Sequence, residues 1–280
     1  MKHRFSWLAL ATVTAIGLVG AMPIKTHAAV SHRYRRSTTA TVFFHGYGSG
    51  AHAERHMVDA AVNAGVTNTV ISANVTGNGH VTMSKKIPRG AINPIVMVNF
   101  EDNENTNYPE DGQYVANVLR KLKKDDHIKT VNLEAHSMGN MALAYYFLKN
   151  SNNSAMPRVK KQLDLAAPMN GIQGYDLPTN FTIDKKTGKP SAMSANYRQM
   201  TKLRQIYPKN QIDILNIYGN VGNGTDDQVD CRSAQSLKYL EDSRAKSFRE
   251  KEITGPGADH VQLHRNPQVD QLLINFFWGK

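Results

Sequence analysis

Ala135-His136-Ser137-Met138-Gly139-Asn140 is the stretch that decides the fold of this chain. An apolar run over 130–135 leads into it and a helix-forming run over 140–149 follows, which predicts a strand, a sharp turn and a helix with Ser137 at the apex. In a small-x-Ser-x-Gly turn the serine is strained and its hydroxyl projects above the sheet. Ala135 and Gly139 provide the small residues needed where strand and helix nearly touch. The alternative is a buried serine in an ordinary strand–helix turn.

The rest of the chain alternates between apolar runs and helical patterns. Such alternation predicts βαβ units, and therefore an α/β fold with a mainly parallel central sheet and helices on both faces. The closing helix begins at Asn266-Pro267 and carries an apolar stripe through Phe277. Strands are expected over 41–44, 69–75, 94–100, 162–167, 211–218 and 248–254, and helices over 54–64, 108–124 and 233–240.

One segment, 171–193, interrupts this alternation. It is polar, and Gly188 is suited to the turn of a hairpin. Because the segment leaves directly after an expected core strand, where lids are often inserted, we expect a small cap over the site; a surface hairpin is the alternative. Residues 29–280 otherwise show no linker and no repeat, and they are expected to form one domain.

The first 28 residues have the pattern of a secretory signal peptide. Lys2 and Arg4 precede an apolar stretch over 5–22, and Thr26-His27-Ala28 offers small residues at a cleavage position. This pattern predicts a secreted or cell-surface protein that starts at residue 29. An uncleaved membrane anchor is the alternative, since the apolar stretch is long enough to span a bilayer.

The chain is basic, with a formal net charge of +11. Removing Lys2, Arg4 and Lys25 with the leader lowers this charge to +8. The balance suits association with anionic cell-wall polymers or lipid headgroups, although a scattered cationic surface is the simpler interpretation. The sequence has no recognisable nucleic-acid-binding module and no interleaving of aromatic and basic residues, so nucleic-acid binding is not expected. Cys231 is the only cysteine, so no intramolecular disulfide can form.

A serine alcohol becomes a nucleophile when a base takes its proton and an acid orients that base. When these groups follow strands in the order Ser, Asp, His, the sequence should supply both after Ser137. The loop after the strand over 211–218 carries Asp226 and Asp227, and the loop after 248–254 carries His260. We therefore predict His260 as the base and one of the two aspartates as the acid.

An oxyanion formed beside Ser137 would need two backbone N–H donors. Met138, the residue after the serine, is expected to supply one. The other should come from the loop after the first strand, Phe43-Phe-His-Gly-Tyr-Gly-Ser49, where the glycines permit an unusual turn and Tyr47 N–H is the expected donor. Ser137, the base, the acid and this loop together predict a serine hydrolase.

The chain resembles the secreted α/β-hydrolases of Gram-positive bacteria grouped as domain of unknown function 915, also called cell-surface hydrolases. The similarity runs from His45-Gly-Tyr-Gly48 to Phe276-Phe-Trp-Gly279 and includes His260-Val-Gln-Leu-His264. The family's acid usually lies in an Asp-Gly-x-Val segment, which matches 226–229 with Asp227 in place of the glycine. The resemblance thus implies Asp226 as the acid. It also implies an α/β-hydrolase fold and carboxylesterase activity on short acyl or aryl esters.

Other ionisable residues near these motifs have simpler interpretations. His264 follows His260 by four residues but lacks a zinc-protease pattern, and we expect it to pack structurally. His45 should hydrogen-bond within its own loop, and His136 should point away from the serine. Asp259 is expected to be solvated, and we do not expect Asp164 to be the acid because it lies inside a strand.

The sequence therefore predicts a secreted serine carboxylesterase that uses Ser137, His260 and Asp226, with Tyr47 and Met138 at the oxyanion. A lipase or acyltransferase of the same fold is an alternative, and so is a catalytically inactive cell-wall binding protein. The expected partner is a small-molecule ester. We expect no cofactor, and no metal, because the acidic run 101–104 lacks calcium-ligand spacing. The sequence leaves the oligomeric state open.

Overall fold

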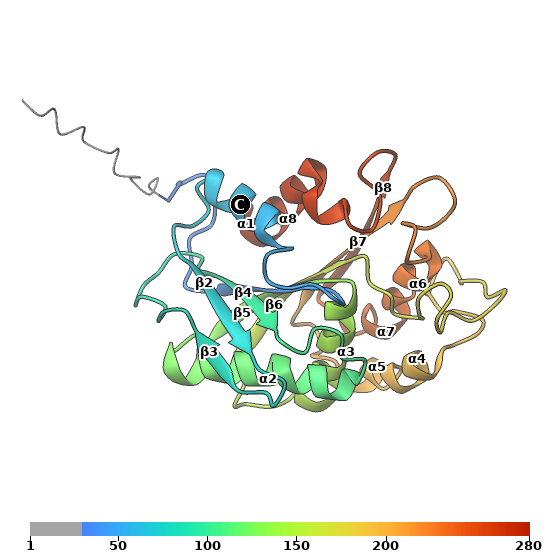
Figure 1. The fold of residues 1–280 in the computed structure, drawn as a ribbon, viewed down its shortest axis with the longest axis horizontal. Coiled ribbons are helices and arrows are strands. Elements are labelled where there is room, and N and C mark those ends of the chain that lie inside the picture. Colours follow the sequence, from blue (N-terminus) through green and yellow to red (C-terminus); the bar gives the residue numbers. More distant parts are fainter. Residues whose placement is uncertain (1–29) are drawn as a thin grey trace, which may run out of the picture.

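The computed structural model describes residues 30–280, which are built around one eight-stranded sheet (Figure 1). Its order is β3-β2-β4-β1-β5-β6-β7-β8, and every neighbouring pair is parallel except β2 and β3. The predicted α/β fold with a mainly parallel sheet is confirmed. The strands are β1 Ala40–Phe44, β2 Val70–Val75, β3 Val81–Met83, β4 Ile95–Phe100, β5 Thr130–His136, β6 Arg158–Leu165, β7 Asp213–Asn220 and β8 Ser247–Thr254.

The predicted signal segment, 1–28, lies outside the described residues. Within 30–280, no helix combines the length and the apolar character that a bilayer crossing needs.

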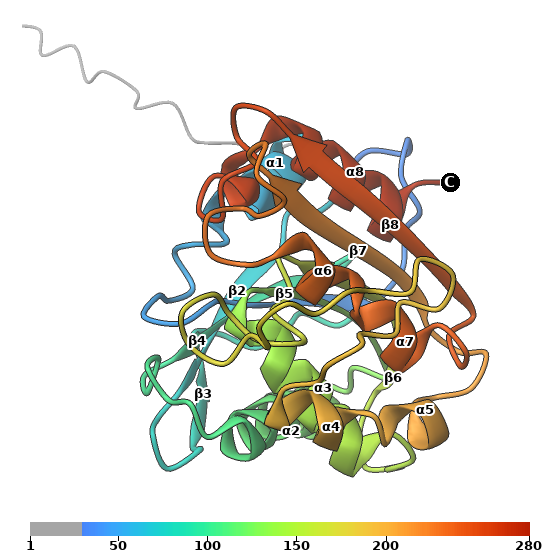
Figure 2. The ribbon, with the colours of Figure 1, turned by 90° about the vertical axis from the view of Figure 1, so that its right-hand side faces the viewer.

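Helices cover both faces of the sheet (Figures 1 and 2). One face carries α1 Arg55–Asn63 and α8 Pro267–Trp278, with the short 3-10 helix η1 Leu263–Arg265 before α8. The longer helices α2 and α3 cover the opposite face. That face comprises α2 Tyr108–Asp125, α3 Met138–Asn150, α4 Ala195–Met200, α5 Leu203–Ile206, α6 Cys231–Gln235 and α7 Leu237–Glu241.

The central strands are buried on both sides because both of their faces are covered. In β5, Val131, Leu133 and Ala135 are fully buried in the core that includes α2 and α3. In β1, Phe43 packs into the other core, with α1 and α8. Buried strands such as β1 and β4 are near-continuous apolar runs, and this pattern identifies them in the sequence.

The loops that carry the predicted site residues all leave the carboxyl ends of parallel strands. They follow β1, β5, β7 and β8. Because β1, β5, β6, β7 and β8 lie in this order in the sheet, these loops meet at one edge. The opposite edge holds the amino ends of the same strands.

Two regions differ from the sequence-based expectations. The helix expected over 233–240 is two short helices, α6 and α7, that meet at Ser236. Ser233 O accepts hydrogen bonds from both Ser236 N (3.2 Å) and Ser236 Oγ (2.6 Å), which tightens the turn and interrupts the α-helical pattern. The antiparallel edge strand β3 and the helices α4 and α5 were not predicted, because each is too short to show a period.

The segment 171–193 contains the expected turn at Gly188, where φ is +72°. Its hairpin pairing is reduced to one bridge between Ile183 and Pro190. Gly188 lies against α7, because an added Cβ would come within 2.7 Å of Lys238 Cβ. At the start of the segment, Gln173 N donates to the Gln228 carbonyl in the loop after β7 (3.3 Å). The hairpin thus lies on α6 and α7. The start of the segment, at Gln173, reaches the loop after β7 that carries Asp226. A role of this segment as a cap stays a prediction.

Candidate active site

Ser137 links β5 directly to α3 in a strained backbone conformation. Its φ is 52° and its ψ is −122°, a region that residues other than glycine rarely occupy. An added Cβ at Gly139 would lie 2.7 Å from Phe44 O, so the start of α3 passes too close to β1 for any side chain. The strain and the close approach are those expected of the small-x-Ser-x-Gly turn.

Asn140 holds this turn in place. Its side-chain amide donates to Ser137 O (2.9 Å) and to Leu165 O at the end of β6 (3.0 Å). Ser137 N also donates to Leu165 O (2.9 Å). One buried side chain therefore ties the strained residue to the neighbouring strand. Asn140 belongs to the turn motif, but this role could not be predicted from the sequence, because the hydrogen bond to Leu165 O depends on the position of β6.

Three predicted residues from distant loops form a continuous hydrogen-bonded series. Ser137 Oγ lies 2.9 Å from His260 Nε2, and His260 Nδ1 lies 2.8 Å from Asp226 Oδ2. The other carboxylate oxygen of Asp226 accepts from Val229 N (2.6 Å) and Gln228 N (3.1 Å), which fixes the carboxylate. In this geometry His260 can take a proton from the serine while Asp226 orients the ring.

Asp227 does not take part in this series. It is exposed, with φ at 72°, and its own N–H donates to Thr225 Oγ1 (3.0 Å). Asp226 is instead only 1% exposed, and its backbone carbonyl accepts from His260 N (2.8 Å). Of the two adjacent aspartates, the structure therefore brings Asp226 to the histidine.

The loop after β1 lies directly against the serine. An added Cβ at Gly46 would lie 3.0 Å from Ser137 Cβ, so a larger residue here would crowd the serine. Within the described residues, the N–H groups of Tyr47 and Met138 donate to no protein acceptor. Both N–H groups are thus free to donate to a ligand, and their role as oxyanion donors stays a prediction.

The His45 side chain anchors the loop after β1 to β4. Its Nδ1 lies 2.8 Å from Gly46 O, and its Nε2 accepts from Phe100 N on β4 (3.0 Å). One ring nitrogen must therefore carry hydrogen and the other must not. Burial lowers the pKa of His45, which favours this neutral form.

A second histidine, His136, supports the base. Its Nε2 lies 3.1 Å from the backbone carbonyl of His260, and its ring packs between His260 and His264 with centroids 4.8 and 4.9 Å away. Burial lowers the pKa of His136 well below its usual value, and the neighbouring His260 lowers it further. His136 thus serves as a neutral donor that holds the loop of His260. His264, in turn, bonds Ala53 O through Nδ1 (2.9 Å), in keeping with its expected structural role.

We expect His136→Phe to slow the reaction of Ser137 with a fluorophosphonate about fivefold. The ring packing is kept but the hydrogen bond to the His260 carbonyl is lost, a change on the order of 1 kcal/mol. The measurement is the second-order labelling rate constant, with the melting temperature recorded in parallel. His264→Phe is the matched control, because it alters the same ring cluster without touching His260; its labelling rate should stay within about twofold of wild type. Equal labelling by His136→Phe and wild type would contradict this role.

Two buried glutamates lie on the α1 and α8 side of the sheet below the serine turn. Glu54 precedes α1 and Glu134 lies in β5, and neither is exposed. Their carboxylate oxygens have no donor among the described residues. Burial raises the pKa of Glu54 to about 8, and burial together with the charge of Glu54 raises the pKa of Glu134 well above its usual value. Both groups therefore favour their neutral, protonated forms in the fold.

Raising the pH should destabilise the wild type through Glu54. A folded-state pKa raised from 4.5 to about 8 gives stability that is fully present below about pH 4.5 and lost as the pH rises through 8. The free energy of unfolding of wild type relative to Glu54→Gln should therefore fall by on the order of 3 kcal/mol between pH 5 and 8.5. Denaturant titrations at the two pH values measure it, with the exposed Glu104→Gln as control. A pH-independent difference for Glu54→Gln would contradict the assignment.

The remaining predicted alternatives lie outside the series. Asp164 is buried in β6 on the opposite face of the sheet from Glu134, where Gln162 Nε2 bridges it to Glu241 Oε2 (2.9 and 3.0 Å). Burial raises the pKa of Asp164 to about 7. Asp259 accepts from Val261 N (3.0 Å) and so shapes the turn after the base. Neither contacts Ser137 or His260 by a hydrogen bond within residues 30–280.

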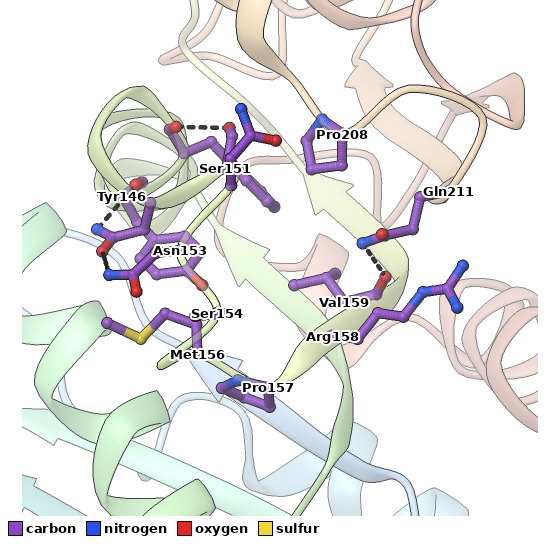
Figure 3. A pocket seen from close by; sticks show the side chains of 13 residues that line it. Tyr146, Ser151, Asn153, Ser154, Met156, Pro157, Arg158, Val159, Pro208 and Gln211 are labelled. Carbon is purple, nitrogen blue, oxygen red and sulfur yellow. Dashed lines mark hydrogen bonds between the residues drawn. The ribbon is translucent and has the colours of Figure 1, made fainter.

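A polar cavity of about 310 Å³ lies at the far end of α3 (Figure 3). Its polar side chains are bonded within the protein; for example, Gln211 Nε2 donates to Val159 O (3.0 Å) and Ser151 Oγ to Phe147 O (2.6 Å). Ser137 is at the other end of this helix, so the cavity is remote from the candidate site. Across residues 30–280 no three His, Cys, Asp or Glu side chains gather in a way that could hold a metal ion.

A mainly parallel sheet with a strained serine between β5 and α3, followed by an acid loop and a histidine loop, is the arrangement of the α/β hydrolases. Residues 29–280 match the family described as alpha/beta hydrolase of unknown function (DUF915). The chain belongs to this family, which confirms the resemblance read from its motifs.

Several solved structures of bacterial proteins share this fold. A gene product of Listeria innocua is 22% identical, with a TM-score of 0.77 over 86% of this chain and 94% of its own. A Lactobacillus plantarum protein, provisionally described as a cell surface hydrolase, is 15% identical, with a TM-score of 0.66 over 85% and 88%. The Bacillus licheniformis lipase BlEst2 in its propeptide form is 14% identical, with a TM-score of 0.52 over 89% of this chain and 52% of the lipase. No curated protein matches the sequence.

Proposed function

We propose that this α/β hydrolase is a serine carboxylesterase. The observation that carries the proposal is the series of hydrogen bonds from Ser137 Oγ through His260 to Asp226, with distances of 2.9 and 2.8 Å. A histidine placed between a strained serine and a fixed carboxylate is the arrangement that activates a serine hydroxyl. Because Ser137, His260 and Asp226 are all present and hydrogen-bonded, the alternative of a catalytically inactive binding protein gains no support.

In the proposed reaction, Ser137 Oγ attacks the ester carbonyl carbon while His260 Nε2 takes the hydroxyl proton. That proton passes to the leaving alcohol, and an acyl group remains on the serine. Water then attacks the acyl carbon, His260 takes one proton from it and returns that proton to Ser137 Oγ, and the carboxylic acid leaves. Asp226 keeps Nδ1–H directed away from the serine throughout.

The oxyanion of each tetrahedral intermediate would lie between Tyr47 N–H and Met138 N–H. Both belong to segments whose backbones are fixed, by the His45 hydrogen bonds and by the start of α3. Donors that are positioned before the reaction stabilise the developing charge without reorganising, and each typically contributes about 10²–10³ in rate. The amino end of α3 adds a favourable dipole.

Short acyl or aryl esters are the substrate class we favour. Tyr47, Tyr175 and Val261 are the large hydrophobic side chains exposed in the described part of the chain, at 55%, 73% and 42%. Tyr47 lies within the predicted oxyanion loop, Val261 follows the base, and Tyr175 lies in the turn that reaches the acid loop. Three separate side chains at this edge suit a small apolar group, whereas a lipid interface needs a broad contiguous patch. The lipase alternative is correspondingly less supported.

An extracytoplasmic location is part of the proposal. It is supported by the signal-peptide pattern of residues 1–28 and by the description of the Lactobacillus plantarum relative as a cell surface hydrolase.

Purified protein should hydrolyse p-nitrophenyl acetate and butyrate, and Ser137→Ala should lose at least about 10³ of kcat/KM because the nucleophile is gone. The rate of p-nitrophenol release at a series of acyl chain lengths measures this. Activity confined to long chains and rising at the micelle threshold would favour a lipase instead. Undiminished turnover by Ser137→Ala, or no reaction of wild type with a fluorophosphonate, would overturn the proposal.

The adjacent aspartates provide a matched pair for the acid. Asp226→Asn should lower kcat by on the order of 10³–10⁴, because the amide no longer selects the productive tautomer of His260. Asp227→Asn removes the same charge from the next residue and should leave kcat within about twofold, since Asp227 is exposed and bonds none of the three groups. Equal losses in the two variants would show that the acid is wrongly assigned.

A further inference from the structure

A pocket of about 370 Å³ lies at the amino ends of the central strands, at the edge of the sheet opposite Ser137. The segment before β1, the amino-terminal halves of β5 and β6, and the last turn of α8 form its walls. Its lining combines four basic side chains with hydroxyls, amides and two aromatic rings: Arg35, Arg36, Lys160, Lys161, Ser37, Thr39, Asn93, Asn132, Phe277 and Trp278.

The charged lining of this pocket is entirely cationic. No carboxylate contributes to its walls. Asp213 is the acid whose charge acts on Lys161, and it is already bound by Lys246 Nζ (2.8 Å) and Ser247 Oγ (2.7 Å). Four cations that converge without a counter-charge repel one another, and an anion between them relieves this repulsion.

Two of these cations are free to bind a ligand. The Arg35 side chain forms no hydrogen bond or ion pair within residues 30–280, and Lys160 Nζ has only a 3.4 Å contact with Thr39 Oγ1. Lys161 differs, because its Nζ donates to the backbone carbonyls of Phe276 and Phe277 and so holds the end of α8. In this pocket Lys161 is therefore fixed by the protein, whereas the charged groups of Arg35 and Lys160 can bind a ligand.

Trp278 supplies an independent sign of a missing acceptor. The residue is 2% exposed and lines the pocket, yet its Nε1 has no hydrogen-bond partner. Every other unpartnered polar atom among the buried side chains of residues 30–280 is an oxygen. A buried N–H without an acceptor is costly, and this unpaired donor belongs to a residue that lines the basic pocket.

We propose that this pocket binds a phosphodiester group of an anionic polymer or lipid headgroup. Guanidinium and ammonium groups bind phosphate oxygens with strong, charge-assisted hydrogen bonds, and arginine does so in a fork. A cavity of this size accepts one phosphodiester group, and hydroxyl and amide side chains complete the polar wall.

The position of the pocket gives this binding a geometric consequence. The amino and carboxyl ends of parallel strands lie at opposite edges of the sheet, so a surface held at the pocket faces away from the Ser137 edge. Arg35 N also donates to Trp278 O (2.8 Å), which joins the first described residues to the pocket wall. Binding here would hold the protein at an anionic surface with the Ser137 edge open to solution.

The test uses the fluorescence of Trp278. The chain has two tryptophans, Trp7 and Trp278, so Trp7→Phe leaves the pocket residue as the only reporter. A soluble poly(glycerol phosphate) oligomer and vesicles of phosphatidylglycerol are the two probes, with phosphatidylcholine vesicles and polyglutamate of equal charge as references. We expect saturable binding that weakens with added salt, and a fluorescence change on binding. The relative affinities of oligomer and vesicles identify the source of the phosphodiester.

Arg35→Gln/Lys160→Gln should weaken binding at least about tenfold, because two charge-assisted contacts are lost. Arg35→Lys/Lys160→Arg, which keeps both charges, should retain most of it. Lys85→Gln/Lys86→Gln removes the same charge beside Asp125 and Asp126, away from the pocket, and should bind like the parent. Turnover by all these variants should match wild type. Equal losses in both Gln pairs, or polyglutamate binding as tightly as the phosphate oligomer, would overturn the site in favour of general surface charge.

Discussion

The backbone reversal at Ser137 is the constraint on which the rest of the structure depends. A positive φ at a residue other than glycine costs on the order of 1–3 kcal/mol, and surrounding contacts must hold it. Here the Asn140 amide, the hydrogen bond from Ser137 N to Leu165 O and the close approach of Gly139 to β1 do so. The result is a hydroxyl directed at His260 and a helix that starts beside it.

The interior around this reversal is polar but adapted to carry little charge. Burial lowers the pKa values of His45 and His136, and it raises those of Glu54 and Glu134. All four groups therefore favour their neutral forms inside the protein. The two histidines then act as directional donors and acceptors for the oxyanion loop and the base loop. Positive charge that forms on His260 during turnover would meet Asp226 without a second cation among these neighbours.

Much of this arrangement could be predicted from the sequence, because it depends on local patterns and their order. The apolar strand, Ser137 and Gly139 lie within ten residues, and the loops of Asp226 and His260 follow strands with clear apolar runs. The choice of Asp226 came from the family resemblance, whereas the structure gives it a physical basis in the burial of Asp226 and the exposure of Asp227. The roles of Asn140 and His136, the Glu54–Glu134 pair and the basic pocket depend on packing between distant segments, which no local pattern records.

The most direct test of the account is to trap the covalent intermediate. Protein mixed with p-nitrophenyl acetate and quenched in acid within milliseconds should carry one acetyl group, and peptide mapping by mass spectrometry should place it on Ser137. The account predicts that this label appears with a burst of p-nitrophenol and decays as the ester is consumed. Turnover without any acetylated peptide, or an acetyl group that resides on another side chain, would contradict the central claim.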